Sequence, residues 1–398
     1  MPTLTEQLTT KPGKNDRSSR PPFGFNVCGF ISGNFGLGFA ARNTIRLLLE
    51  NNFPVAVYDL PLAGAAGTAS HEYDHLRSAP DNPFPYQFTV FHVNPPLLPQ
   101  LSAVYRPFAP SRINVLVPFW ELERAPVSWP SLCADIDLFL APSRFIEQCL
   151  KGIFPPEKVR YYRQSYTLPG PIVPDRERFG IPADATVFFQ SFDIASDIER
   201  KNPLATIHAF HNAFQAAPGV QLIMNVNVTN TNAVFLNAVA KLKEYVAAVP
   251  TIRIFDRPFG YAEVLTLCAS CDVLVSLHRS EGLGLSLIEA MAMRKPVITT
   301  AYSGSMDFVS GENACLIPYS MIPAVSPFNP QLQRDKLGFD PFWADPDIDA
   351  AARCMRRLAD DRGYRNSLGK NARKSIMRFL NESAKAEVFY SLQNEVNG

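Results

Sequence analysis

Short apolar runs alternate with segments of helical apolar spacing from residue 23 onward. The run FGFNVCGFI predicts a buried strand, GLGFAARNTIRLLLENN predicts a helix, and FPVAVYDL predicts a second strand. Three more strand-like runs follow, each with helix or turn signals behind it, at 86–94, 113–120 and 137–143. Strands that alternate with helices are typical of a parallel sheet covered on both faces.

The Pro- and Gly-containing stretch 167–185 interrupts this pattern and is predicted to connect two domains. Beyond it the alternation restarts, with helices at 202–214 and 284–293 and strands at 186–193, 220–227, 252–258, 272–277 and 295–300. We therefore predict an α/β fold of two Rossmann-like, doubly wound domains that face a central cleft. A length of 398 residues agrees with this, because it exceeds one ordinary hydrophobic core.

The domain boundaries follow from changes in the same pattern. Residues 1–22 are polar and lack periodicity, which predicts a mobile N-terminal arm. Residues 23–170 are expected to form the first domain, which a C-terminal helix at 377–398 rejoins, and residues 171–376 the second. The Pro-rich segment 317–346 is longer than most internal loops, so it is either a lid, an acceptor-contacting insertion or a plain surface excursion.

Composition constrains the partners and the compartment. Lys and Arg total 38 against 37 for Asp and Glu, so no global field attracts nucleic acid, and we expect no nucleic-acid partner. The chain lacks an apolar run of about 18 residues and its start is polar, which favours a cytoplasmic protein. Seven scattered cysteines indicate free thiols. Cys268 and Cys271 form a CxxC without a second ligand pair, and we interpret them as core residues.

The most informative stretch is SLHRSEGLGLSLIEAMAMRKPVITT (276–300), which contains a strand, a glycine loop, a helix and a second strand. Gly282 and Gly284 let backbone N–H groups approach a phosphate at the start of the helix. Glu281 and Glu289 are separated by about 10 Å if the segment between them is helical, which matches the span of a nucleotide sugar. The alternative is a helix-capping acid and an exposed helix residue. The apolar run around Glu289 argues against it, because an unpaired carboxylate there is costly.

This stretch, with EGLGLSLIEAM followed by KPVIT, resembles the signature of the retaining family 4 glycosyltransferases, which belong to the GT-B superfamily and to glycosyl transferases group 1. The resemblance extends over most of the chain after the arm, through APSRF (141–145), SDIERKNPLATIHAF (196–210), YSGSMDFV (302–309) and WADPD (343–347). It implies a GT-B fold and retention of the anomeric configuration.

The resemblance also implies roles for individual residues. Glu281 would bind the donor sugar and Glu289 the ribose, with the loop and helix start formed by Gly282, Leu283, Gly284 and Leu285. Arg200 and Lys201 lie in the region where the family neutralises the diphosphate, although Ser196 stands here at the position where the family often has its arginine. The alternative interpretation of the two basic residues is a solvated helix start. Two further departures are Arg294, where glycine is usual, and Ser303-Gly304-Ser305 in place of a glycine pair.

In the first domain, GNFGLG (33–38) places Gly36 and Gly38 between a strand and a helix, where they could approach the donor phosphates. The motif also resembles a nicotinamide fingerprint with reversed order, and Asp59 ends the next strand. His92 and Asn94 end the strand 86–94, where the resembling enzymes place a polar residue near the sugar. A lone histidine at a strand end is more often structural. His278, beside the glutamate motif, either contacts the donor or holds the loop.

No metal and no cofactor are expected. Two Asp-x-Asp patterns, Asp135-Ile-Asp137 and Asp345-Pro-Asp347, lie outside any Gly-rich donor loop and are interpreted as structural. Retaining members of the family react on one face of the sugar, with the leaving diphosphate assisting removal of the acceptor proton. The resemblance therefore implies no dedicated protein base, and leaves positioning and charge stabilisation to the protein.

The sequence thus predicts a retaining hexosyltransferase-type glycosyltransferase that uses a nucleotide diphosphate sugar as donor substrate, as in polysaccharide biosynthesis. The expected acceptor is a glycan, a lipid-linked sugar or a small molecule, and weak peripheral membrane association is left open. Three alternatives stay open: a GT-B sugar-nucleotide epimerase, a phosphorylase, and a non-catalytic nucleotide-sugar-binding scaffold.

Overall fold

The computed structural model describes residues 21–61, 70–167, 170–228, 232–257 and 259–397. The chain divides into two compact units, and the predicted arm at 1–22 lies almost wholly outside the described residues. Among the described residues, unit 1 comprises 21–61, 70–167 and 380–397, and unit 2 comprises 170–228, 232–257 and 259–379.

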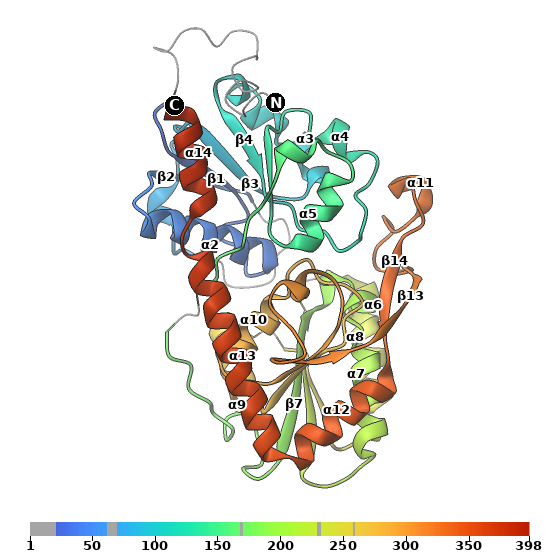
Figure 1. Ribbon diagram of the computed structural model, residues 1–398. Coiled ribbons are helices and arrows are strands. Elements are labelled where there is room, and N and C mark those ends of the chain that lie inside the picture. Colours follow the sequence, from blue (N-terminus) through green and yellow to red (C-terminus); the bar gives the residue numbers. More distant parts are fainter. Residues whose placement is uncertain (1–20, 62–69, 168–169, 229–231, 258, 398) are drawn as a thin grey trace. The chain divides into compact units, whose positions relative to one another are not determined.

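Unit 1 is built on a six-stranded parallel sheet with the order β2-β1-β3-β4-β5-β6 (Figure 1). Its strands are β1 (Phe25–Gly29), β2 (Val55–Asp59), β3 (Phe88–His92), β4 (Ile113–Leu116), β5 (Leu138–Ala141) and β6 (Val159–Tyr161). Its helices are α2 (Gly36–Glu50), α3 (Leu98–Tyr105), α4 (Trp129–Leu132), α5 (Arg144–Lys151) and α14 (Glu387–Asn397). Short 3₁₀ helices cover Asp74–Leu76, Pro95–Leu97, Ala109–Ser111 and Pro156–Lys158.

Successive residues of these strands pack on opposite faces of the sheet, as the pleat requires. Phe25 and Phe88 belong to the core on one face, and Phe91 to the core on the other. The final helix α14 joins the first of these cores, where the ring of Phe389 lies 5.3 Å from that of Phe25 in an edge-to-face contact. The C-terminal segment therefore completes the hydrophobic core of unit 1.

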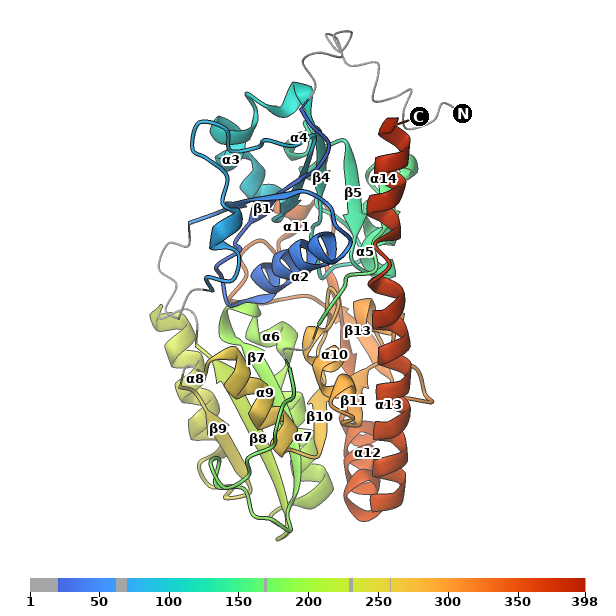
Figure 2. The ribbon, with the colours of Figure 1, turned by 90° about the vertical axis from the view of Figure 1, so that its left-hand side faces the viewer.

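Unit 2 contains a second six-stranded parallel sheet, with the order β12-β11-β10-β7-β8-β9. Its strands are β7 (Thr186–Asp193), β8 (Val220–Asn227), β9 (Ile252–Phe255), β10 (Val273–Ser276), β11 (Val297–Thr300) and β12 (Cys315–Ile317). Its helices are α6 (Ile198–Lys201), α7 (Pro203–Phe214), α8 (Ala233–Val246), α9 (Tyr261–Ser270), α10 (Leu285–Ala292), α11 (Arg334–Leu337), α12 (Ile348–Asp360) and most of α13 (Arg362–Ser383). Two 3₁₀ helices cover Ile194–Ser196 and Ser303–Asp307. Helices α9 and α10 lie on one face of this sheet, and α7 and α12 on the other (Figure 2).

The strand order of unit 2 has one reversal point. The chain runs outward through β7, β8 and β9, returns to pair β10 with β7 on its other side, and then runs outward through β11 and β12. This is the Rossmann order, in which ligands bind outside the carboxyl ends of the two strands that flank the reversal. The loops after β7 and β10 therefore meet at the position where such a fold places its ligand.

The prediction of two Rossmann-like α/β domains is confirmed, and the main difference concerns segment 317–346. The strands β13 (Tyr319–Pro323) and β14 (Phe342–Pro346) pair there as an antiparallel ribbon, so the segment is neither irregular nor a simple loop. Strands β6 and β12 were not predicted, because three-residue strands are too short to show a period. Cys268 and Cys271 are buried, as predicted, and burial raises the pKa of Cys268 to about 12. Across the described residues, none of the helices has the length and apolarity needed to span a bilayer.

Candidate active site

The candidate site of unit 2 forms where the segments after β7 and β10 meet. After β7 the chain passes through a 3₁₀ turn into the four-residue helix α6, which ends at Lys201. After β10 it forms the loop that carries Glu281 and leads into α10. The two segments are joined directly, because the backbone N–H of Arg279 donates to the carbonyl oxygen of Arg200 at 2.8 Å.

Lys201 and Glu281 form the central ion pair of the site. The Lys201 Nζ donates to Glu281 Oε1 at 2.5 Å, and both side chains are largely buried. The other carboxylate oxygen, Oε2, lies 3.6 Å from a terminal nitrogen of Arg200. Two cations therefore share one carboxylate, so these three side chains together carry one excess positive charge.

Arg200 is held in place by backbone acceptors on both segments. Its guanidinium donates to the carbonyl oxygen of Ser280 at 2.9 Å and to that of Ser196 at 2.7 Å. The side chain is only 9% exposed. Arg200 thus links the α6 turn to the Glu281 loop, and the backbone carbonyl of Ser196 helps to orient its guanidinium.

The electrostatic environment keeps Glu281 ionised. Burial by itself raises the pKa of a carboxyl group, but the charges of Lys201 and Arg200 oppose it and bring the pKa of Glu281 down to about 2. At neutral pH the side chain is a carboxylate, so it can accept hydrogen bonds and cannot donate one.

The segment after β11 forms hydrogen bonds to the backbone of the Glu281 loop. The hydroxyl of Ser303 accepts the backbone N–H of Glu281 at 2.8 Å, and the N–H of Gly304 donates to the carbonyl oxygen of Glu281 at 2.9 Å. A Cβ atom on Gly304 would lie 2.0 Å from the carbonyl oxygen of Gly282. Only glycine fits at this close approach, so Ser303-Gly304-Ser305 preserves the glycine that the loop requires.

Helix α10 begins directly after the Glu281 loop. Gly284 is its N-cap and has a left-handed backbone with φ of +93°, a conformation that favours glycine. The backbone N–H groups of Leu287 and Ile288 both donate to the carbonyl oxygen of Gly284. The positive end of α10 therefore lies three residues beyond Glu281 in the chain, as the sequence predicted. Leu283 is buried and Leu285 half-buried, so a ligand of this loop would meet mainly backbone.

Glu289 lies in α10 and is half-buried. Its Oε1 accepts a hydrogen bond from the hydroxyl of Tyr261, at the start of α9, at 2.8 Å. The carboxylate is thus neither unpartnered nor a fully solvated helix residue. Its assignment to a ribose stays a prediction.

His278 is fully buried, and its contacts are with the neighbouring strand. Its Nε2 lies 3.2 Å from the hydroxyl oxygen of Thr299, and its carbonyl oxygen accepts a hydrogen bond from Thr300 at 2.6 Å. Burial lowers the pKa of His278 to about 4, so the ring is neutral at pH 7. Of the two predicted roles, these contacts support holding the loop.

Sequence reasoning missed Arg279, which connects three segments. Its guanidinium donates to Asp345 of β14 at 3.0 Å and to the Glu199 carboxylate of α6 at 3.1 Å. Its carbonyl oxygen accepts the backbone N–H of Ala344. The sequence does show an arginine inside the glutamate motif and acidic residues at 199 and 345. It does not show that Arg279 pairs with them, because only the folded chain brings the three side chains together.

The four candidate residues of unit 1 have different surroundings. His92 at the end of β3 is fully buried, and neither ring nitrogen has a hydrogen-bond partner within the described part of the chain; burial lowers its pKa to about 3. Asn94 accepts the backbone N–H of Phe119 at 2.9 Å, so its carbonyl oxygen holds the next loop. A Cβ on Gly38 would lie 2.1 Å from the carbonyl oxygen of Gly33, so the local turn by itself requires glycine at position 38. Gly36 is exposed.

The remaining acidic residues have structural partners. Asp59 pairs with Arg77 at 2.8 Å, which accounts for it without a nicotinamide nucleotide. Asp135 pairs with Arg106, and Asp137 accepts the backbone N–H of Asn114. Asp347 caps α12. Asp345 pairs with Arg279, so the acids of both Asp-x-Asp patterns have partners within the protein. Among the described residues, no group of three His, Cys, Asp or Glu side chains is placed to hold a metal ion.

Comparison with known proteins bears on this geometry. Residues 213–325 match the family model described as Glycosyl transferases group 1, a range that includes Glu281, Glu289 and Gly304. Comparison with curated proteins gives no match.

Solved structures resemble the whole chain. Anabaena HepE in complex with UDP and glucose aligns with a TM-score of 0.63 at 14% identity, covering 94% of this chain and 100% of that one. Sucrose-phosphate synthase from Thermosynechococcus elongatus aligns with a TM-score of 0.66 at 14% identity over the same shares. A glycosyltransferase from Rickettsia africae aligns with a TM-score of 0.64 at 15% identity, covering 92% and 97%.

At these identities the structural likeness establishes the fold, and the family match adds the segment that contains both glutamates. The chain therefore has the two-domain fold of these glycosyltransferase structures, and residues 213–325 of its second unit match the model of the glycosyl transferases group 1 family.

Proposed function

We propose that this protein is a retaining glycosyltransferase that moves a hexose from a nucleotide diphosphate sugar to a glycan, a lipid-linked sugar or a small-molecule acceptor. The observation that carries the proposal is the cluster of Lys201, Arg200 and Glu281 at the strand reversal of a Rossmann-type sheet. A pyrophosphate needs fixed positive charge, and a sugar needs hydrogen-bond acceptors. This cluster supplies both within one contact network.

Lys201 and Arg200 are assigned to the diphosphate. Their two charges exceed the single charge of Glu281, so the diphosphate of the donor, with one negative charge on each phosphate, is attracted to these side chains. When the sugar–phosphate bond breaks, negative charge accumulates on the leaving diphosphate, and cations already fixed in place stabilise that charge without reorganisation. The N-terminal end of α10 adds to the same positive potential.

Glu281 is assigned to the sugar hydroxyls. Its carboxylate stays ionised because its pKa is about 2, so it accepts hydrogen bonds throughout the physiological pH range. Lys201 and Glu281 contact each other at 2.5 Å, so donor binding would exchange part of this ion pair for contacts to phosphate and sugar. We assign Glu289 to the ribose.

The donor is proposed to be a uridine diphosphate sugar. The HepE structure that this fold resembles contains UDP and glucose, and the chemistry of a UDP-hexose matches the charges and acceptors of the cluster. In this assignment the protein positions donor and acceptor, and the departing diphosphate takes the acceptor proton.

Thermal unfolding in the presence of UDP-, GDP- and ADP-sugars tests the donor. A ligand at 100 times its dissociation constant stabilises the folded state by about 2.7 kcal/mol, so one nucleotide should raise the melting temperature clearly above the others. No shift with any of them, in protein that remains folded, would contradict the proposal.

Labelled donor, incubated with and without candidate acceptors, tests the reaction. Transfer yields a glycoside whose anomeric configuration, read by NMR, equals that of the donor. An epimerised sugar nucleotide without acceptor would identify an epimerase, a sugar phosphate formed from phosphate a phosphorylase, and donor binding without turnover a scaffold.

A further inference from the structure

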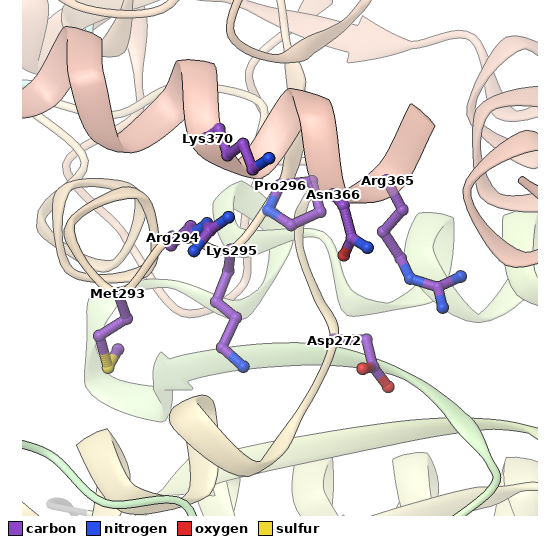
Figure 3. Close-up of a pocket in the computed structure, with 8 residues that line it drawn as sticks. All are labelled: Asp272, Met293, Arg294, Lys295, Pro296, Arg365, Asn366 and Lys370. Atoms are coloured by element: carbon purple, nitrogen blue, oxygen red, sulfur yellow. The ribbon is translucent and has the colours of Figure 1, made fainter. Parts of the chain in front are cut away.

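A pocket lies in unit 2 at the end of β10 opposite to Glu281. It has a volume of about 420 Å³ and is lined by eight residues (Figure 3): Asp272, Met293, Arg294, Lys295, Pro296, Arg365, Asn366 and Lys370. Asp272 immediately precedes β10 and Pro296 immediately precedes β11, so the pocket is at the amino ends of these parallel strands. It is therefore separate from the candidate active site at their carboxyl ends.

The pocket is strongly cationic. Four basic side chains line it against one carboxylate, Asp272, and that carboxylate already pairs with Arg176 at 2.7 Å. Arg294 and Lys370 are exposed, and among the described residues neither has a hydrogen bond or an ion pair through its side chain. An anion in the pocket would meet their charges without displacing an existing partner.

The other two cations have structural contacts that leave donors available. Lys295 Nζ donates to the carbonyl oxygens of Ala269 and Cys271 at 2.6 and 2.5 Å. Arg365 uses Nη1 for carbonyl oxygens near the end of α12. Each side chain keeps its full charge, because a carbonyl group does not neutralise it.

The backbone of Arg294 has a left-handed conformation, which is unfavourable for any residue other than glycine. Arg294 follows the end of α10 with φ of +62°. Its N–H donates to the carbonyl oxygen of Met291, and the N–H of Lys295 donates to that of Ala290. These two bonds define a Schellman motif, in which the left-handed position is usually glycine. An arginine at this position is strained, and its guanidinium lines the pocket instead of satisfying a partner in the fold.

The helix α13 brings the other half of the pocket close to Arg294. A Cβ on Gly369 would lie 2.4 Å from the carbonyl oxygen of Arg294 and 3.2 Å from Pro296 Cδ. Glycine therefore permits the backbone of α13 to lie against the α10–β11 turn. This close approach places Arg365 and Lys370, which flank Gly369 on the same helix, in the wall that faces Arg294.

We propose that this pocket is a binding site for a small anion that carries two or more phosphate groups. Guanidinium and ammonium groups are the side chains that recognise phosphate, the first through paired hydrogen bonds and the second as a point charge. The volume lies within the range of about 300–1,000 Å³ that small-molecule sites occupy. The site goes beyond the proposed transfer reaction and does not depend on it.

Isothermal titration with inorganic pyrophosphate and tripolyphosphate at low salt tests the site. The double variant Arg294→Gly with Lys370→Ala should weaken tripolyphosphate binding at least tenfold, and added salt should weaken it in the unsubstituted protein. The matched control Lys241→Ala removes a lysine from the exposed face of α8, away from the pocket, and should bind as the unsubstituted protein does.

A Lys201→Ala variant separates the two phosphate sites. The proposed pocket predicts that tripolyphosphate binding persists in Lys201→Ala and that adding the Arg294→Gly and Lys370→Ala changes removes it. Unchanged affinity in the double variant would overturn the proposal, as would binding that is lost in Lys201→Ala alone or weakened equally by Lys241→Ala. Because Arg294→Gly relieves a strained conformation, a melting temperature that is not lowered shows that reduced affinity does not come from unfolding.

Discussion

The Nζ of Lys201 lies 2.5 Å from Oε1 of Glu281, although 80 residues separate them in the chain. The fold creates this contact by pairing β7 with β10, so that the segments that follow the two strands leave the sheet side by side. The ion pair fixes a carboxylate and two cations at the strand reversal before any ligand arrives. Preorganised charge of this kind is what a reaction with a departing diphosphate requires.

Replacement of Lys201 should impair transfer far more than it impairs folding. Lys201→Ala removes one of two cations from the cluster, and loss of a single preorganised group that stabilises transition-state charge lowers kcat by about 10²–10³-fold in well-studied enzymes. We expect a fall of that size in kcat/KM with the donor identified by thermal shift. The control Lys241→Ala should keep the original value, and equal losses in both variants would contradict the assignment.

Glu281 should contribute a pH-dependent part of the stability. Its folded-state pKa of about 2 lies below the ordinary value of 4.5, so its contribution is fully present above pH 4.5 and is lost as the pH falls through 2. The size is on the order of 3 kcal/mol, since each pKa unit corresponds to about 1.4 kcal/mol.

Urea unfolding of the unsubstituted protein and of Glu281→Gln measures this contribution. The free-energy difference between them should be constant from pH 7 to about pH 5 and should shrink below pH 4.5. A difference that does not change with pH would mean that the carboxylate gains nothing from Lys201 and Arg200.

The order of strands and helices could be predicted from the sequence because each element has its own hydrophobic period. Strands β7 and β8 were placed at their observed ends, since both are long and largely apolar. The ribbon of β13 and β14 escaped prediction because half of its residues are exposed and polar residues interrupt it. Pairing of that kind depends on a partner strand that the local sequence does not reveal.

The site was predicted only as far as local signals reach. Glu281, Gly284 and the start of α10 are close in the chain and share one motif, so their proximity could be inferred. The link from Arg279 to Asp345 spans 66 residues and has no local signature. Gly304 likewise differs from an ordinary turn glycine only through its distance to Gly282, which is a property of the folded chain.

Gly304 offers a test of that close approach. Gly304→Ala places a Cβ 2.0 Å from the carbonyl oxygen of Gly282, so the backbone of the Glu281 loop must move. Such overpacking costs about 1–3 kcal/mol, and the displaced Glu281 should lower the transfer rate as well. Gly311→Ala is the matched control, because nothing lies within 4 Å of its Cβ and its φ is not positive. Chemical unfolding should show loss of stability in the first variant and none in the second; equal stabilities would mean that the loop repacks freely.

Arg294 allows conformation and charge to be separated by two substitutions at one position. Arg294→Gly and Arg294→Ala both remove the guanidinium, but only glycine adopts φ of +62° without a Cβ penalty. The left-handed conformation costs a residue with a Cβ about 1–2 kcal/mol, and glycine avoids this cost. Glycine also has a higher conformational entropy in the unfolded state, which offsets part of its advantage. We therefore expect Arg294→Gly to be more stable than Arg294→Ala by up to about 1 kcal/mol in urea unfolding at neutral pH. Both should bind tripolyphosphate more weakly than the unsubstituted protein, because affinity depends on the charge and not on the backbone. If the two variants instead had different affinities for tripolyphosphate and equal free energies of unfolding, Arg294 would have a structural role at the end of α10 and no role in the pocket.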